Sequence, residues 1–161
     1  MEKYSSIIEM INTGICDFNT FLNTEYNLPI IDAEHIENSV ASWKLKEEAW
    51  FDRPFPNADS RGVYFVFGFN PENDVEKAVY VGKASHENSM FAARLDKHLN
   101  NPEKENKMYK MRHKNGLDYE LDFVTTIPLN EMPFISSAAE EFLIYFLKSK
   151  GVNLLNHVGN K

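Results

Sequence analysis

The sequence GVYFVFGF at residues 62–69 decides the fold of this chain. Its odd-numbered positions from 63 onward hold only Val and Phe, and this period of two predicts a β-strand. The next residues, NPEND at 70–74, are turn formers. A second strand is predicted over AVYVG at 78–82, so the two strands form a β-hairpin.

Before this hairpin, the sequence predicts two helices and a linker. Apolar residues recur at spacings of three and four between residues 4 and 22, as on one face of a helix. Asp32 can cap a second helix, which carries Trp43 on its apolar side and ends by Phe51. Two prolines and several turn formers over 53–60 then predict a linker.

After the hairpin, helical and strand patterns alternate. They predict, in order, a helix over 91–99, a turn at Asn115-Gly116, a strand over 119–125, a helix from Ser136 or Ser137 to Lys150 and a closing strand over 152–158. The fold class is therefore α+β, with helices flanking a small, mostly antiparallel sheet.

Composition narrows the class of protein. The chain has 161 residues and 43% hydrophobic content, which is enough for one packed core. It has no apolar run of about 18 residues and no signal-peptide pattern, so we expect a cytoplasmic protein without a membrane segment. Cys16 is the only cysteine, which excludes an internal disulfide and a cysteine-cluster metal site. Its apolar neighbours predict a buried thiol.

The formal net charge of −7 is unevenly distributed. Residues 1–60 hold 11 acidic and 4 basic residues, whereas residues 83–116 hold 8 basic and 4 acidic ones. A basic segment in an acidic chain is suited to contact nucleic-acid phosphates, although a solvated loop over 104–114 would carry the same charges. The candidates for substrate contact are Lys97, Lys107, Lys110 and Arg112.

Several polar residues of the hairpin and the following helix are suited to phosphate chemistry. Arg94 offers a planar fork of donors, and His98 follows four residues later on the same helical face. Tyr64 and Tyr80 can each hold a water, but a phenol needs a nearby positive charge to act as a base at neutral pH. Lys83, at the end of the second strand, can supply that charge.

The segments Gly62-Val63-Tyr64 and Tyr80-Val81-Gly82-Lys83, followed by Arg94 and His98, resemble the GIY-YIG nuclease family. This family includes repair incision domains, homing endonucleases and some restriction enzymes. The resemblance runs from Gly62 to about Lys161 and implies a three-stranded antiparallel sheet flanked by helices. The two phenols lie further apart than is typical of the family, so residues 69–77 are interpreted as an enlarged turn.

The same resemblance implies a metal ligand late in the chain. Glu140, followed by apolar residues three and four positions later, matches the family's glutamate and would hold one Mg²⁺ or Mn²⁺ ion through a single carboxylate. The neighbouring Glu141 is the alternative, because only one of the two can face the sheet. Asn156 matches a terminal asparagine with a structural role.

The catalytic roles implied are those of a DNA endonuclease. Tyr64 would be the general base, or would orient water, with its pKa lowered by Lys83. Arg94 would stabilise charge on the phosphate, and Tyr80 and His98 would bind phosphate or water. His86 is either a catalytic residue or a loop residue. The site-forming glycines are Gly62 and Gly82.

Two questions stay open at the level of the sequence. Residues 61–161 would form the nuclease-like domain, and residues 1–60 an acidic helical extension and linker. This extension would pack on the core, form a homodimer or recognise substrate; acidic helices do not suit DNA, which favours the first two. The alternative function is a catalytically silent module on the same fold that binds nucleic acid or protein.

Overall fold

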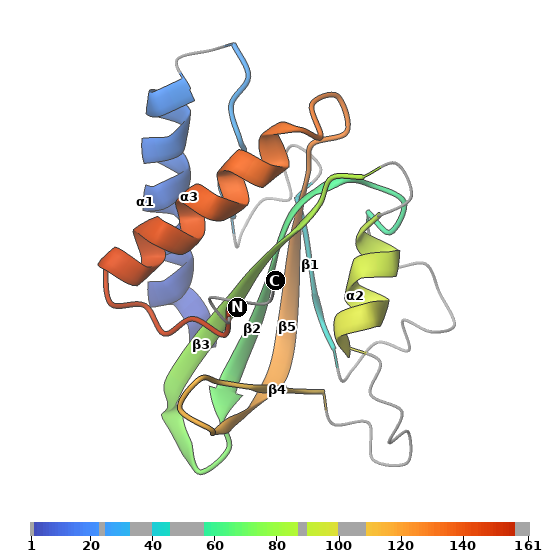
Figure 1. The fold of residues 1–161 in the computed structure, drawn as a ribbon. Coiled ribbons are helices and arrows are strands. Elements are labelled where there is room, and N and C mark those ends of the chain that lie inside the picture. The colour runs from blue at the N-terminus through green and yellow to red at the C-terminus, as the bar shows by residue number, and fades with distance from the viewer. Residues whose placement is uncertain are drawn as a thin grey trace.

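The computed structural model of the protein describes residues 2–22, 25–32, 40–45, 57–86, 90–99 and 109–156, without the side chains of Lys97 and His98. Figure 1 shows its helices and strands. They are η1 (Glu2–Tyr4), α1 (Ser5–Leu22), β1 (Ala41–Lys44), β2 (Gly62–Asn70), β3 (Asn73–Ala84), α2 (Phe91–Leu99), β4 (Lys110–Arg112), β5 (Asp118–Pro128) and α3 (Ile135–Ser149).

The sheet is antiparallel, and the α+β class is confirmed. It has five strands rather than the predicted three: the order is β1-β5-β2-β3, and β4 pairs with β5. The added strands β1 and β4 are four and three residues long. Such short segments carry too little alternation to be distinguished in a sequence, and they are strands because β5 offers them a partner.

The β2–β3 hairpin has long strands and a tight turn. β2 ends at Asn70 and β3 begins at Asn73, so only two residues form the connection. The prediction of an enlarged turn over 69–77 is therefore wrong, because Phe69 pairs with Lys77 within the ladder. Of the turn formers at 70–74, Pro71 and Glu72 make the connection, and Glu76 lies within β3, where it accepts hydrogen bonds from Tyr119 and Asn70.

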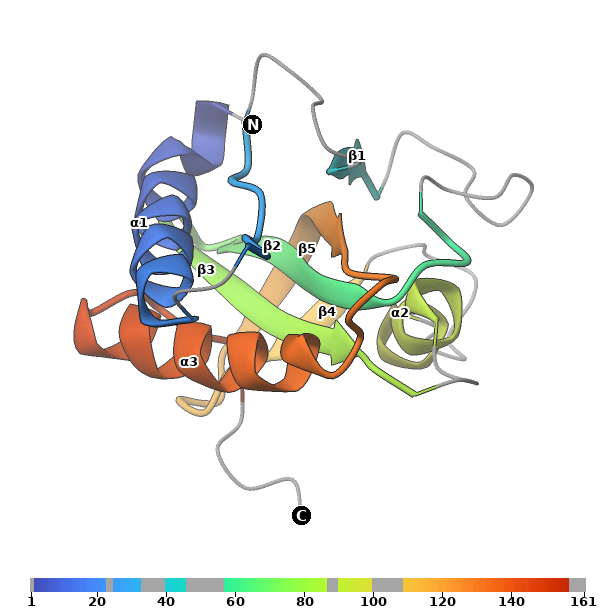
Figure 2. The same ribbon diagram turned by 90° about the horizontal axis from the view of Figure 1, so that it is seen from above.

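Two layers of core lie on opposite faces of the sheet. In Figure 2, α1 and α3 lie on one side of the sheet and α2 on the other. The odd-numbered residues of β2, such as Phe65, pack toward α1 and α3, and the even-numbered Tyr64 and Val66 pack toward α2. Both faces of β2 are buried, which explains why the strand is apolar at nearly every position.

The predicted N-terminal helix is confirmed as α1, and it belongs to the main core. Ile11 and Ile15 are fully buried in the cluster that contains the sheet and α3. Gly14 lets the two helices approach closely: a Cβ there would lie 2.8 Å from Cδ1 of Phe146. The prediction of a buried thiol is wrong for Cys16, which lies on the exposed side of α1.

The prediction of a second helix from Asp32 to Phe51 is wrong where the structure describes that stretch. Residues 41–44 form β1, paired with residues 123–126 of β5. The buried Ala41 and Trp43 alternate with the more exposed Ser42 and Lys44, which is the period of a strand. Residues 33–39 and 46–56 lie outside the described part of the chain.

The predicted later elements are found with changes at their ends. α3 begins at Ile135 and its N-cap is Phe134, so neither predicted serine caps it; Ser136 is buried in the first turn and donates to the Pro133 carbonyl. Of the closing strand expected over 152–158, the described residues 152–156 form one parallel bridge, between Leu154 and Val79. No helix among the described residues is long and apolar enough to cross a membrane.

Candidate active site

The two candidate phenols lie on the α2 face of the hairpin. In the β2–β3 register Tyr64 pairs with Gly82, and Val66 pairs with Tyr80. The phenol rings lie 6.1 Å apart between centroids, at 34° to each other. Tyr64 is fully buried and Tyr80 is only partly so, which leaves Tyr80 as the phenol with access to solvent.

Gly82 makes room for the ring of Tyr64. A Cβ at position 82 would lie 2.3 Å from Cζ and 2.5 Å from the hydroxyl oxygen of Tyr64, closer than non-bonded atoms approach. The ring therefore lies directly over the backbone of its cross-strand partner. The residue type at 82 and the position of the phenol are linked by sterics alone.

Gly62 is required by its backbone conformation. Its φ is +154°, a region that L side chains rarely adopt, and a Cβ there would lie 2.1 Å from the carbonyl oxygen of Ile127. Position 62 pairs with Ala84 on one side and with Pro128 on the other. The absence of a side chain at position 62 thus allows β2 to begin close to both β3 and β5, two residues before Tyr64.

Helix α2 brings Arg94 to the hairpin. The Nε of Arg94 donates a hydrogen bond to the carbonyl oxygen of Lys83, at 3.2 Å. Phe91, the first residue of the helix predicted over 91–99, packs edge-on against Tyr64 with centroids 6.0 Å apart. These two contacts hold the first turn of α2 beside the phenols.

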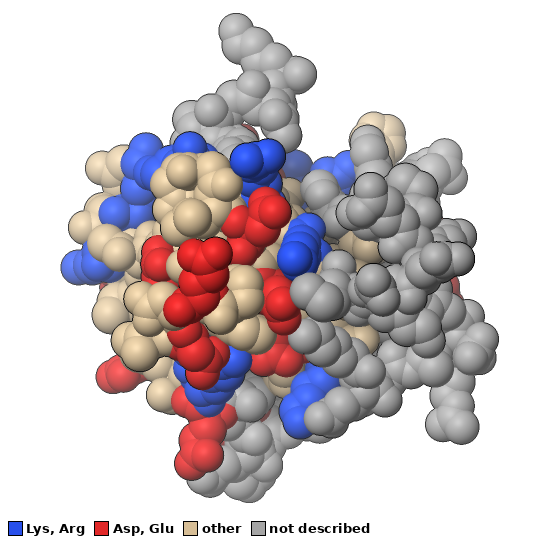
Figure 3. Space-filling model, turned by 90° about the horizontal axis from the view of Figure 1, so that it is seen from below, with Lys and Arg blue, Asp and Glu red and all other residues tan. Residues whose placement is uncertain are grey.

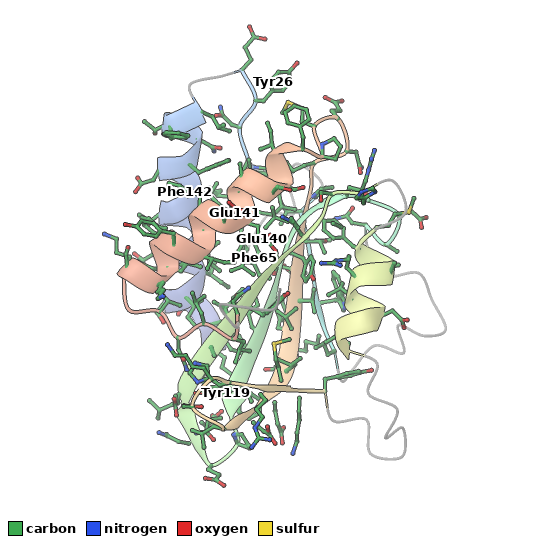
Figure 4. The ribbon with its side chains drawn as sticks, in the orientation of Figure 1. Tyr26, Phe65, Tyr119, Glu140, Glu141 and Phe142 are labelled. Atoms are coloured by element: carbon green, nitrogen blue, oxygen red, sulfur yellow. The ribbon has the colours of Figure 1, made fainter. Side chains whose placement is uncertain are left out.

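Helix α3 brings Glu140 to Lys83 from the other side of β3. The Nζ of Lys83 lies 3.1 Å from Oε2 of Glu140, and the two side chains are 27% and 16% exposed. Glu141 is exposed, so Glu140 is the member of the pair that faces the sheet. Figure 4 shows Glu140 over the strands and Glu141 on α3 beside it.

The candidate site forms around β3, which is the last strand in the order β1-β5-β2-β3. Lys83 pairs with Val63 and shares its face, whereas Tyr80 lies on the opposite face of β3. Residues from two faces can meet here because β3 has a strand neighbour on only one side. Burial is the main cause of the raised pKa values of Tyr64 and Tyr80, and the negative charge of Glu140 adds to both.

Asn156 fastens the last described segment to this strand. Its side-chain amide donates to the carbonyl oxygen of Val81 at 2.7 Å and accepts from the Val81 amide at 2.8 Å. Two backbone hydrogen bonds, Val79 to Asn153 and Leu155 to Val79, continue the contact. The segment after α3 is thus tied to β3 between the two site residues Tyr80 and Gly82.

Burial controls the acidity of the phenols. Desolvation raises the pKa of Tyr64 well above 10, a hydrogen bond with Tyr80 adds to the rise, and the charge of Arg94 opposes it. Burial also raises the pKa of Tyr80, again with Arg94 opposing. The expectation that Lys83 lowers the pKa of Tyr64 is wrong in this structure, because Lys83 is paired with Glu140 and burial prevails.

Of the remaining candidate residues, Lys110 and Arg112 lie away from Tyr64, and the structure does not bring them to the phenols. His86 is exposed beyond the end of β3. Lys110 and Arg112 lie on β4, which pairs with residues 118–120 at the other end of β5 from Thr126, the partner of Tyr64. The side chains of Lys97 and His98, and all of Lys107, lie outside the described residues.

Glu140 is the oxygen ligand available for a cation in the cluster. No group of three or more His, Cys, Asp or Glu side chains suited to a metal is found where the structure is described. A divalent ion here would therefore be held by the Glu140 carboxylate and waters, a donor set that fits Mg²⁺. The Lys83 ammonium would have to give up its place beside that carboxylate.

Comparison with known proteins gives no relative for this arrangement. No family model matches the chain, and no curated protein and no solved structure does so either.

Proposed function

We propose that the protein is a metal-dependent endonuclease of the GIY-YIG type that hydrolyses DNA phosphodiester bonds. The observation that carries this proposal is the convergence of Tyr80, Arg94 and the Lys83–Glu140 pair around β3, with Glu140 coming from α3, far along the sequence from β3 and α2. A phenol, a guanidinium and a carboxylate in reach of one another are the groups that phosphodiester hydrolysis needs.

In this proposal Arg94 binds the scissile phosphate. Its Nε is anchored on the Lys83 carbonyl, and its other N–H donors face the developing charge on the phosphoryl oxygens. Tyr80, the more exposed phenol, donates to or orients the attacking water, since its raised pKa keeps it protonated at neutral pH. Tyr64 acts through Tyr80 and holds it in place.

Glu140 would hold the divalent ion, which supplies Lewis-acid stabilisation of the charge on the phosphate when it is bound. Lys83 then becomes available to the phosphate as a second cation. Exposed charges of both signs lie at the turn end of the sheet: the acidic Glu72, Asp74 and Asp118, and the basic Lys110, Arg112 and Lys114. Figure 3, seen from below, shows acidic side chains gathered across the middle of that face.

Cleavage of supercoiled plasmid DNA in Mg²⁺ or Mn²⁺ tests the proposal. We expect wild type to nick the plasmid and Glu140→Ala to lose at least about 100-fold in rate, as when one charge-stabilising group is removed. The matched control is Glu141→Ala, an exposed neighbour on the same helix, which should cut like wild type. An inactive wild type, or equal rates for both variants, would contradict the proposal.

A catalytically silent binding module is favoured by one observation: Glu140 is already paired with a lysine. Calorimetric titration with Mg²⁺ separates the two functions. A nuclease should give a binding isotherm that Glu140→Ala abolishes and Glu141→Ala retains. A wild-type protein that binds DNA without taking up Mg²⁺ would be the silent module.

A further inference from the structure

A second polar site lies at the other end of β3. A cleft of about 680 Å³ lies between the end of α3, the segment that follows it and the turn joining β4 to β5. Its polar lining comes from Glu76, His113, Lys114, Lys148, Asn153 and Asn156. Glu76 precedes Lys83 by seven residues on the strand, about 23 Å at the usual rise, so the Glu76 end of the cleft is far from Lys83, whereas Asn156 at the other end bonds to Val81 beside the candidate active site.

The wall of the cleft is a paired network. The Tyr119 hydroxyl donates to Oε1 of Glu76 at 2.5 Å, and Nδ2 of Asn70 donates to Oε2 at 3.0 Å. Asn153 in turn donates to the Tyr119 oxygen at 2.8 Å. The bond from Tyr119, followed by that from Asn70, lowers the pKa of the Glu76 carboxyl, so it is ionised and both its oxygens already accept.

His113 has one N–H without a partner. The side chain is only 6% exposed, and its ring packs against Tyr119 at 5.6 Å. Nδ1 accepts the backbone N–H of Asn115 at 3.3 Å, which places the proton of the neutral ring on Nε2. No described residue accepts a hydrogen bond from that buried Nε2. A buried donor beside a cleft calls for an acceptor from outside the chain.

The charges around the cleft indicate the kind of acceptor. Lys114 and Lys148 are exposed and line it, and Glu76 is the acid in the lining. Two ammonium groups against one carboxylate give the lining a net charge of +1. Because both carboxylate oxygens of Glu76 are engaged, the groups left for a ligand are donors and cations.

We propose that this cleft binds a phosphate group, with His113 Nε2–H and the ammonium groups of Lys114 and Lys148 as its donors. A phosphate oxygen supplies the acceptor that His113 lacks, and its charge matches the two lysines. A bound metal ion would instead meet two cations and an N–H. The phosphate belongs either to a small phosphorylated molecule or to a nucleic-acid backbone that passes over the cleft.

Calorimetric titrations in EDTA, which excludes divalent ions and any cleavage, test the site. The probes are inorganic phosphate, a nucleoside monophosphate and a short DNA duplex. We expect wild type to bind at least one probe, and His113→Phe and Lys148→Ala each to bind it about tenfold more weakly. Lys150→Ala removes an exposed lysine near the same helix end that does not line the cleft, and its affinity should be unchanged.

The pattern across the probes identifies the source of the phosphate. Loss of affinity for the small probes indicates a small-molecule site, and loss for the duplex alone indicates a backbone contact. Lys148 is exposed, so its variant keeps the test valid if His113→Phe fails to fold. Binding of none of the three probes by wild type, or equal affinity in all variants, would overturn the proposal, whatever the outcome of the plasmid assay.

Discussion

Gly82 and Tyr64 form a single steric unit within the candidate site. The phenol occupies the space that any side chain at 82 would need, so the ring and the glycine depend on each other. The sequence placed both residues in a hairpin and indicated their roles through family resemblance. It gave no means of predicting the contact itself, which follows from the cross-strand register.

We expect Gly82→Ala to lower the free energy of unfolding by about 1 to 3 kcal/mol, because the new methyl group overpacks against the Tyr64 ring. In a Tyr64→Ala background the same change should cost much less, since the clash is gone. Urea denaturation of the four proteins in this double-mutant cycle measures the coupling. Equal costs in both backgrounds would show that the ring does not lie over Gly82.

The choice between Glu140 and Glu141 shows where prediction from sequence stops. The two glutamates are adjacent in the sequence, and their side chains point about 100° apart around a helix. Which one faces the sheet depends on how α3 packs against β3 and α1, and those contacts are distant in sequence. The acidity of the phenols depends likewise on burial, which the local sequence does not reveal.

Among the elements, β3 has its outer edge held by residues 153–156, which follow α3. Asn156 makes both of its side-chain contacts with the backbone of Val81. The amphipathic helices and the long hairpin strands are visible in the sequence because each carries its own period. The bridge at Leu154 and the short strands β1 and β4 are not, because their structure comes from a partner elsewhere.

We expect Asn156→Ala to destabilise the protein by about 2 kcal/mol, since it removes two hydrogen bonds of about 1 kcal/mol each. The Val81 amide should also exchange its hydrogen faster. Denaturation and hydrogen exchange followed by NMR measure both effects. Asn27→Ala, at an exposed position, is the control and should change neither. Unaltered protection of Val81 would mean that the side chain does not hold the strand.

At the scale of the whole molecule, α1 and β1, the described elements before position 61, pack with the same sheet as the elements after it. Helix α1 packs against α3, and β1 extends the sheet from the side of β5. Of the three roles considered for this acidic region, packing on the core is the one that α1 and β1 display. The charge asymmetry of the sequence did not reveal this, because charge reports on the surface of α1 and not on its buried stripe.

We expect Ile11→Ala to lower the free energy of unfolding by about 2 to 5 kcal/mol, as for other fully buried aliphatic residues. Phe21→Ala, on the same helix but 77% exposed, should change it by about 0.5 kcal/mol or less. Thermal or urea denaturation of the whole protein measures both. Similar small effects for the two variants would mean that α1 does not contribute to the core.

The segment from Asn153 to Asn156 also bears on solubility. The outer edge of β3 at Val79 and Val81 would otherwise present bare N–H and C=O groups, which are a template for pairing with a strand of another molecule. Here Asn153, Leu155 and Asn156 occupy those groups. Residues 153–156 therefore cover this edge of β3 and protect it against edge-to-edge aggregation.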